Sequence, residues 1–353
     1  MKKKMLALVL AGIMVVASLT GCKSVKTVDS DEIVMTVNGE EVNAGVANFY
    51  ARYTQAMYES FYGAAMGGSM WTSEAEEGVT IQDSVKGEIL TVLQQMVLAE
   101  QHMAEYGVEL TADEKALVEK AVKEFADANS QDSKEKVSGD DETVERVMTL
   151  LAVNQKMMNT IYASVEQEIP DEEAAQKKME YVQFTYETED ADGNSILVSD
   201  DEKAELKANA DAMQAAVKGG QSMEEAANAV EAQVEELTFD AESLALEEAV
   251  IKAADALGEG EVSEVIETEK GAYVVKVVSL LDREATDAKK ELILSNSQAE
   301  EYEAVCAKWL EEAEIEVNEE VWAKVDFSEL TVTMKMVETD AYADEVVTDD
   351  VAE

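Results

Sequence analysis

The sequence predicts an α+β protein that is mainly helical and carries a small antiparallel sheet in its second half. Apolar residues at helical spacing run through most of the first 170 residues. Pro170, the only proline, then precedes a region where short alternating apolar runs are mixed with helical segments. A further long helical pattern over 288–313 follows that region. Runs of helices with a cluster of strands between them are typical of the α+β class.

Composition limits the partners of this protein. The chain has 353 residues, enough for two domains, with 28 Lys+Arg against 77 Asp+Glu and a formal charge of −49. Such a surface repels phosphate groups, so we expect no nucleic-acid partner. Apolar residues make up 46% of the chain, which is ample for a folded core.

Residues 1–21 have the pattern of an export signal. Lys2, Lys3 and Lys4 precede an apolar run over 5–17 that is too short for a stable membrane span. The sequence Leu19-Thr-Gly-Cys22 resembles a bacterial lipobox, in which Cys22 becomes the lipid-modified first residue. We therefore expect a lipid anchor at Cys22, a polar tether over 22–31 and a location on the extracytoplasmic face of the cell membrane. The alternative is an ordinary signal peptide followed by an unrelated cysteine.

The first helical region opens with a hairpin and an aromatic helix. Ile33–Val37, Asn38-Gly39 and Glu41-Val42 predict strand, tight turn and strand. The next helix carries a broad apolar stripe, which is either ordinary core or a partly open face that binds unfolded peptide. Its candidate peptide-binding residues are Phe49, Tyr50, Tyr53, Met57, Tyr58 and Phe61. The glycine-containing stretch 63–78 is expected to be a loop.

Three further helices are expected before Pro170. They cover Ile81–Tyr106, residues 112–128 behind a capping box at Thr111, and Thr143–Gln167, with a polar loop over 129–142. His102 is the only histidine, and no Cys or plausible base stands beside it. A catalytic or metal-binding role for His102 is therefore not expected, and no metal or cofactor motif was found elsewhere.

The sheet-containing region starts after Pro170. One strand is expected at Tyr181–Tyr186 and a pair of strands within 258–278. Further along, Cys306 lies in an apolar helical pattern that indicates a buried structural thiol. Residues 328–353 are acidic and are expected to form a solvated tail. Helices between the strands are predicted for Ser199–Lys218, for a segment capped by Ser222 and for Leu244–Leu257.

Two stretches resemble known foldases. The run Gly258-Glu-Gly-Glu-Val-Ser263, followed by Lys270-Gly271 and an apolar strand, resembles the last two strands of a parvulin-type peptidyl-prolyl isomerase. The hairpin Val37-Asn-Gly-Glu-Glu-Val42, leading directly into a helix, resembles the start of PrsA- and SurA-like extracytoplasmic foldases. The resemblance implies a discontinuous, mainly helical chaperone domain over 32–170 and 283–327, with a β-α-α-α-β-β parvulin-like domain over 171–282. It also implies unfolded or exported polypeptides as partners and no cofactor, and it leaves a homodimer open.

The resemblance also implies where an isomerase site would lie. Parvulins carry two histidines on central strands, and these positions fall on or beside Tyr181 and on Tyr273. The socket for the proline ring falls near Leu246 and Val250. With phenols in place of imidazoles, the resemblance implies a retained fold with weak or no isomerase activity. An active isomerase and a non-catalytic envelope lipoprotein are the alternatives.

Overall fold

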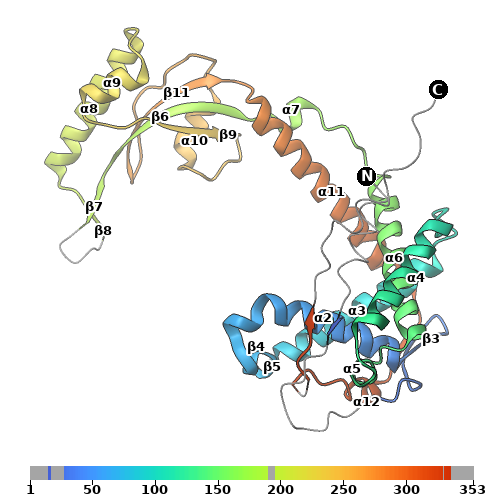
Figure 1. The fold of residues 1–353 in the computed structure, drawn as a ribbon. Helices are drawn as coiled ribbons and strands as arrows, with labels where there is room; N and C mark the ends of the chain where they lie inside the picture. The colour runs from blue at the N-terminus through green and yellow to red at the C-terminus, as the bar shows by residue number, and fades with distance from the viewer. Residues whose placement is uncertain (1–14, 17–27, 190–194, 329, 335–353) are drawn as a thin grey trace. The chain divides into compact units, whose positions relative to one another are not determined.

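The computed structural model describes residues 15–16, 28–189, 195–328 and 330–334. The chain divides into two compact units (Figure 1). The first contains residues 1–165 and 298–353, and the second contains residues 166–297. The prediction of a mainly helical α+β protein with small antiparallel sheets is confirmed. The expected lipidation residue Cys22 and the polar tether up to residue 27 lie outside the described residues.

A three-stranded sheet joins distant parts of the chain in the first unit. Strand β2 (Ile33–Val37) pairs on one side with β3 (Glu40–Asn43) and on the other with β12 (Ile315–Val317), both antiparallel. The hairpin turn is formed by Asn38 and Gly39, with φ of 51° and 80°. Both angles lie in the left-handed region, which Asn and Gly adopt most readily and which matches the predicted tight turn.

Five α-helices follow the hairpin. Capping boxes at Thr80 and Thr111 begin α3 and α4, so the predicted cap at Thr111 is confirmed. Helix α3 ends five residues before the predicted Tyr106, and turns lead to Gly107 at φ 63°. The helices are α2 (Ala44–Met66), α3 (Ile81–Gln101), α4 (Ala112–Ala128), α5 (Gln131–Lys136) and α6 (Asp141–Tyr162).

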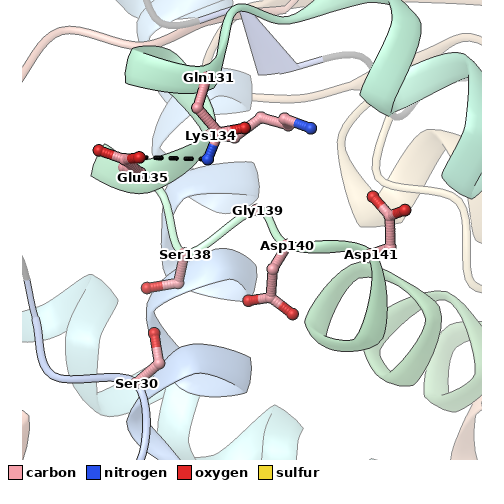
Figure 2. A pocket seen from close by; sticks show the side chains of 8 residues that line it. All are labelled: Ser30, Gln131, Lys134, Glu135, Ser138, Gly139, Asp140 and Asp141. Carbon is pink, nitrogen blue, oxygen red and sulfur yellow. Dashed lines mark hydrogen bonds between the residues drawn. The ribbon is translucent and has the colours of Figure 1, made fainter.

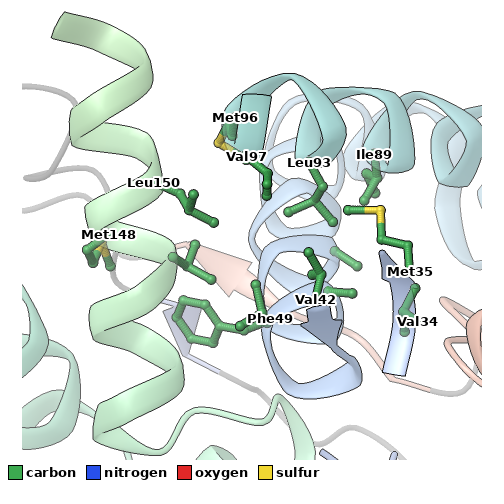
Figure 3. Close-up of a cluster of buried hydrophobic side chains, with 14 of the residues drawn as sticks. Val34, Met35, Val42, Phe49, Ile89, Leu93, Met96, Val97, Met148 and Leu150 are labelled. Carbon is green, nitrogen blue, oxygen red and sulfur yellow. The ribbon is translucent and has the colours of Figure 1, made fainter. Parts of the chain in front are cut away.

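The helices of the first unit enclose one apolar core, part of which Figure 3 shows. Phe49 is fully buried and meets Phe125 edge to face, with ring centroids 5.1 Å apart. Leu93 and Met148 are also fully buried, and burying each side chain of this size stabilises the fold by about 2 kcal/mol. Cys306 is buried and reduced, as predicted, and burial raises the pKa of its thiol.

Two predicted loops contain regular structure. The stretch 63–78 includes the end of α2, a 3₁₀ helix η1 (Gly67–Thr72) and β4 (Glu74–Glu76), which pairs with β5 (Val79–Thr80). The stretch 129–142 contains α5, whose first turn is capped by Ser130. Met70 and Trp71 in the first stretch are buried, so tertiary contacts outweighed the weak local preference of its glycine-containing sequence.

The end of the chain also departs from its prediction. The prediction of a solvated tail from Ser328 onwards is wrong for its first residues, since Leu330 and Val332 are 3% and 0% exposed. They follow α12 (Glu319–Trp322) and lead into β13 (Thr333–Met334), which pairs with β1 (Val15–Val16). Residues 335–353 of the expected tail lie outside the described part of the chain.

The second unit is built on a four-stranded antiparallel sheet with the order β10-β11-β6-β9. The acidic strand β9 was not predicted, because Glu235-Glu-Leu-Thr-Phe239 lacks a continuous apolar alternation. Capping boxes at Ser199 and Ser222 begin α8 and α9 as predicted. The strands are β6 (Lys177–Thr185), β9 (Glu235–Phe239), β10 (Ile266–Glu267) and β11 (Gly271–Ser279), and β7 (Glu187–Glu189) pairs separately with β8 (Ser195–Leu197). The helices are α7 (Asp171–Ala174), α8 (Asp200–Lys218), α9 (Met223–Ala229), α10 (Glu248–Asp255) and part of α11 (Arg283–Glu312).

The two faces of this sheet carry separate cores. Alternate residues such as Val182, Phe184 and Val274 pack with α8 and α9, whereas Met179 and Val275 pack with α10 on the other face. Figure 1 shows α10 and the pair α8–α9 on opposite sides of the strands. None of the helices within the described ranges is both long and apolar enough to cross a membrane.

Candidate active site of the second unit

The sheet face covered by α10 brings both predicted tyrosines together. Tyr181 on β6 lies opposite Val275 of β11, and Tyr273 on β11 lies opposite Gln183 of β6. The two tyrosines are therefore diagonal neighbours on adjacent strands, and both belong to the same apolar cluster. Tyr181 is 8% exposed and Tyr273 is 1% exposed.

The two predicted socket positions also belong to this cluster, and they come from α10 and from the residues just before it. Val250, on the buried side of α10, is 0% exposed. Leu246, just before that helix, is partly buried against the same residues. All four positions named from the resemblance thus meet on one face. Other members of the cluster are Met179, Phe239, Ile251, Ala254, Val275 and Val277.

Each tyrosine hydroxyl donates a hydrogen bond to a glutamate. Tyr181 Oη donates to Glu235 Oε2 at 2.6 Å, and Tyr273 Oη donates to Glu247 Oε2 at 2.7 Å. Thr268 Oγ1 donates to the other oxygen of Glu247 at 2.8 Å. The glutamates come from the start of β9 and from the residue before α10. Among 77 acidic residues, no sequence pattern distinguished these two.

The hydrogen bonds and burial keep both phenols neutral. Burial and the bond to Glu235 raise the pKa of Tyr181 to about 12. Burial and the bond to Glu247 raise the pKa of Tyr273 further. Burial alone would raise the pKa of Glu247, but hydrogen bonds from Tyr273 and Thr268 outweigh it and lower that pKa. Near neutral pH the two phenols are therefore hydrogen-bond donors and do not exchange protons readily.

The chemistry open to this face is binding and desolvation. Rotation about an X-Pro bond has a barrier of about 18–20 kcal/mol and breaks no covalent bond, so an apolar socket and a few donors can lower it. Here Val250 and Tyr273 are buried core residues, at 0% and 1% exposed, and both phenol donors are already engaged by carboxylates. Within the described residues, no group of His, Cys, Asp and Glu side chains is arranged to hold a metal ion.

The only histidine lies in the first unit and has a structural environment. His102 stacks on Trp309 with ring centroids 4.8 Å apart and an interplanar angle of 5°. Its Nδ1 lies 3.0 Å from Glu105 Oε2. These contacts show a ring held by packing on an aromatic neighbour.

The candidate peptide-binding residues on α2 separate into two groups. Phe49 does not qualify, because it is fully buried in the core, and this corrects the sequence-based assignment. Tyr50, Tyr53 and Tyr58 are partly buried against the same core. Met57 and Phe61 are exposed, at 37% and 76%. The stripe is thus core at the start of the helix and surface towards its end.

A polar cavity of about 430 Å³ in the first unit has no counterpart in the sequence predictions. Figure 2 shows Ser30, Ser138 and Asp140 around it, with Lys134 and Glu135 on α5. Gln131 Nε2 donates to Glu135 Oε1 at 3.1 Å within this group. None of its lining side chains is a large apolar one, so this cavity is a poor match for an unfolded apolar segment.

Comparison with known protein families gives a match for most of the second unit. Residues 164–290 match the family of PPIC-type PPIase domains. Among solved structures, the chain is similar to the foldase PrsA of Lactococcus lactis, with 16% identity and a TM-score of 0.34 over 84% of this chain and 98% of that one. It is also similar to the SurA-like chaperones PEB4 and Cj1289 of Campylobacter jejuni, with 10% identity and a TM-score of 0.29 over 82% and 99%. A search of curated proteins found no match. Most of the second unit is therefore matched by the model of PPIC-type PPIase domains, and the chain as a whole is similar to solved structures of PrsA and of SurA-like chaperones.

Proposed function

We propose that this protein is an extracytoplasmic foldase that holds unfolded exported polypeptides on an exposed apolar patch of α2. We use patch here for the exposed large apolar side chains on the second half of α2, namely Met57, Phe61, Tyr62 and Met66, which are 37%, 76%, 54% and 42% exposed. Large apolar side chains gathered on one part of a soluble protein surface are typical of a protein-binding site. This patch is the observation that carries the proposal.

The composition of the patch suits varied partners. Methionine adapts its shape to irregular apolar surfaces, and Tyr and Phe present large areas with few rotatable bonds. The charge of −49 would keep a complex with an unfolded chain soluble through mutual repulsion. Exported chains leave the membrane unfolded, and a lipid anchor on Cys22 would keep the foldase where they emerge. In this arrangement the first unit, made of residues 1–165 and 298–353, is the holding domain, and the second unit is inserted in its sequence.

We further propose that the isomerase domain is weak or inactive. The positions that resemble the two parvulin histidines carry Tyr181 and Tyr273, whose hydroxyls bind Glu235 and Glu247. A raised tyrosine pKa removes the proton exchange near neutral pH that an imidazole provides. The domain then acts as a folded scaffold that binds proline-containing segments with little acceleration of rotation.

The holding function is tested by suppression of aggregation. Chemically unfolded citrate synthase is diluted into buffer with the chain starting at Cys22, and light scattering is followed. We expect suppression at stoichiometric amounts, and a clear loss of it in a Phe61→Ser/Tyr62→Ser variant. Leu292→Ser is the matched control, because Leu292 is 53% exposed on α11 in the second unit. Equal suppression by both variants, or none by the parent protein, would contradict the proposal.

An active isomerase is the second candidate, favoured by the domain match over 164–290. Refolding of a client limited by proline isomerisation separates the candidates. Acceleration by catalytic amounts of the protein, reduced in a Tyr273→Phe variant that circular dichroism shows to be folded, would establish the enzyme. We expect a rate close to that of the uncatalysed reaction.

A further inference from the structure

A segment near the end of the chain lies along α2 as an extended peptide. Residues 326–328 and 330–334, here named the C-terminal strap, have no helix and form a strand only at β13. The strap runs in the same direction as α2. Arg52 binds its first residue, Gln55 binds its middle and Glu59 binds Val332.

The contacts from α2 are directed at the main chain of the strap. Arg52 Nη1 donates to the carbonyl oxygen of Asp326 at 2.9 Å. Gln55 Nε2 donates to the carbonyl oxygens of Phe327 and Leu330 at 3.1 and 2.5 Å. Glu59 Oε2 accepts from the amide of Val332 at 2.8 Å. Every residue has a carbonyl, and all but proline have an amide, so these bonds would form with almost any extended sequence.

Apolar sockets accept the side chains of the strap. Phe327 is 1% exposed and meets Trp71 edge to face with ring centroids 4.7 Å apart. Leu330 and Val332 are almost completely buried. Main-chain hydrogen bonds combined with pockets for separate side chains are the way proteins bind extended peptides of varied sequence.

The polar row Arg52, Gln55 and Glu59 is unusual for a helix face that is covered. Arg52 is 2% exposed and Gln55 is 0% exposed. Buried polar side chains cost stability unless they are hydrogen-bonded, and here their hydrogen bonds go to the main chain of the strap. Polar groups that can bind water or another peptide after the strap leaves suit an occupant that is exchanged. One turn further along, Phe61 and Tyr62 extend the same helix as exposed apolar surface.

We infer that the row Arg52, Gln55 and Glu59 with the Trp71 socket is a binding site for an extended apolar polypeptide, and that the C-terminal strap is its resident competitor. The inference rests on the proposed holding function, which it deepens by naming the bound form of the client. A client segment displaces the strap by taking over its main-chain hydrogen bonds and its apolar sockets.

The first test uses a fluorescein-labelled peptide with the sequence of residues 326–334 and measures its anisotropy. A Leu330→Ser/Val332→Ser variant has a loosened strap and an intact row, with Thr331→Ser as the control because Thr331 is exposed. We expect the loosened variant to bind the peptide at least about tenfold more tightly than the control, since the resident strap no longer competes. Unfolded citrate synthase should displace the peptide, and adding Gln55→Leu should abolish binding. A folded loosened variant that does not bind the peptide would overturn the inference.

If the loosened variant does not fold, a second measurement on the unaltered protein tests the inference instead. Amide hydrogen exchange at residues 330–334 of the unaltered protein is followed with and without saturating unfolded citrate synthase. Faster exchange with client supports the inference, and unchanged exchange overturns it. If the unaltered protein suppresses aggregation but the labelled peptide never competes with client, the inference fails while the holding function stands. Failure of the holding function is seen separately, as aggregation that the unaltered protein does not slow.

Discussion

Tyr273 Oη and Glu247 Oε2 lie 2.7 Å apart and join the central strand β11 to the start of α10. Thr268 holds the second oxygen of the same carboxylate. The hydrogen bond fixes the helix that carries Val250 above the sheet. Glu247 therefore links the start of α10 to the central strand through Tyr273.

Tyr273→Phe removes the hydroxyl and leaves a partly buried carboxylate with one side-chain donor fewer. We expect the free energy of unfolding to fall by about 1–3 kcal/mol, the usual cost of removing a partner from a charged acceptor. Urea denaturation followed by circular dichroism measures this change. Tyr186→Phe, on the opposite face of the sheet, is the control and should change stability less. A loss equal to that of the control would show that the bond to Glu247 contributes nothing.

Alkaline pH should weaken the second unit through Tyr181. Its pKa in the folded protein is raised from 10.0 to about 12, first by burial and then by the bond to Glu235. A raised pKa means that the unfolded chain loses its proton first, so the stabilisation is complete below pH 10 and is lost as pH rises towards 12. Unfolding free energies of the parent and of Tyr181→Phe, measured between pH 8 and pH 11, should converge as pH rises. Parallel curves would rule out this linkage.

Gly271 is required by a close approach between two strands. A Cβ atom at this position would lie 2.6 Å from the carbonyl oxygen of Phe184 on the neighbouring strand. We expect Gly271→Ala to destabilise the protein by roughly 1–3 kcal/mol, because main-chain atoms must move apart. Gly87→Ala is the control, since a Cβ on this α3 residue meets no atom within 4 Å. There the change should be neutral or stabilising by up to about 1 kcal/mol. Thermal denaturation of both variants checks the contrast.

Cys22→Ser should release the protein from the membrane. The residues before Cys22 resemble a lipobox, and serine cannot carry the thioether-linked lipid. Fractionation of cells that express each form should show the parent in the membrane pellet and the variant in the soluble or secreted fraction. Cys306→Ser, at the other cysteine, should leave the distribution unchanged. A variant that remained in the pellet would mean that another feature attaches the protein.

The sequence by itself determined the local features. Capping boxes at Thr111, Ser199 and Ser222, and the left-handed turn at Asn38-Gly39, depend on contacts within a few residues, so spacing and residue type were enough. The family resemblance placed Tyr181 and Tyr273 on neighbouring strands of one sheet, and the register places them on one face.

Only the tertiary structure decided which groups those residues meet. Glu235 is 54 residues from Tyr181 in the sequence, and Glu247 is 26 residues from Tyr273. Strand β9 forms because it pairs with the free edge of β6. The apolar stripe of α2 divides into a buried Phe49 and an exposed Phe61 because Phe125 and the rest of the core cover only its first turns. Leu330 and Val332 belong to the acidic C-terminal segment by sequence, yet they are buried, because side chains of α2 form hydrogen bonds with their main-chain groups. Burial depends on what lies opposite a residue in space, and periodicity along the chain does not contain that information.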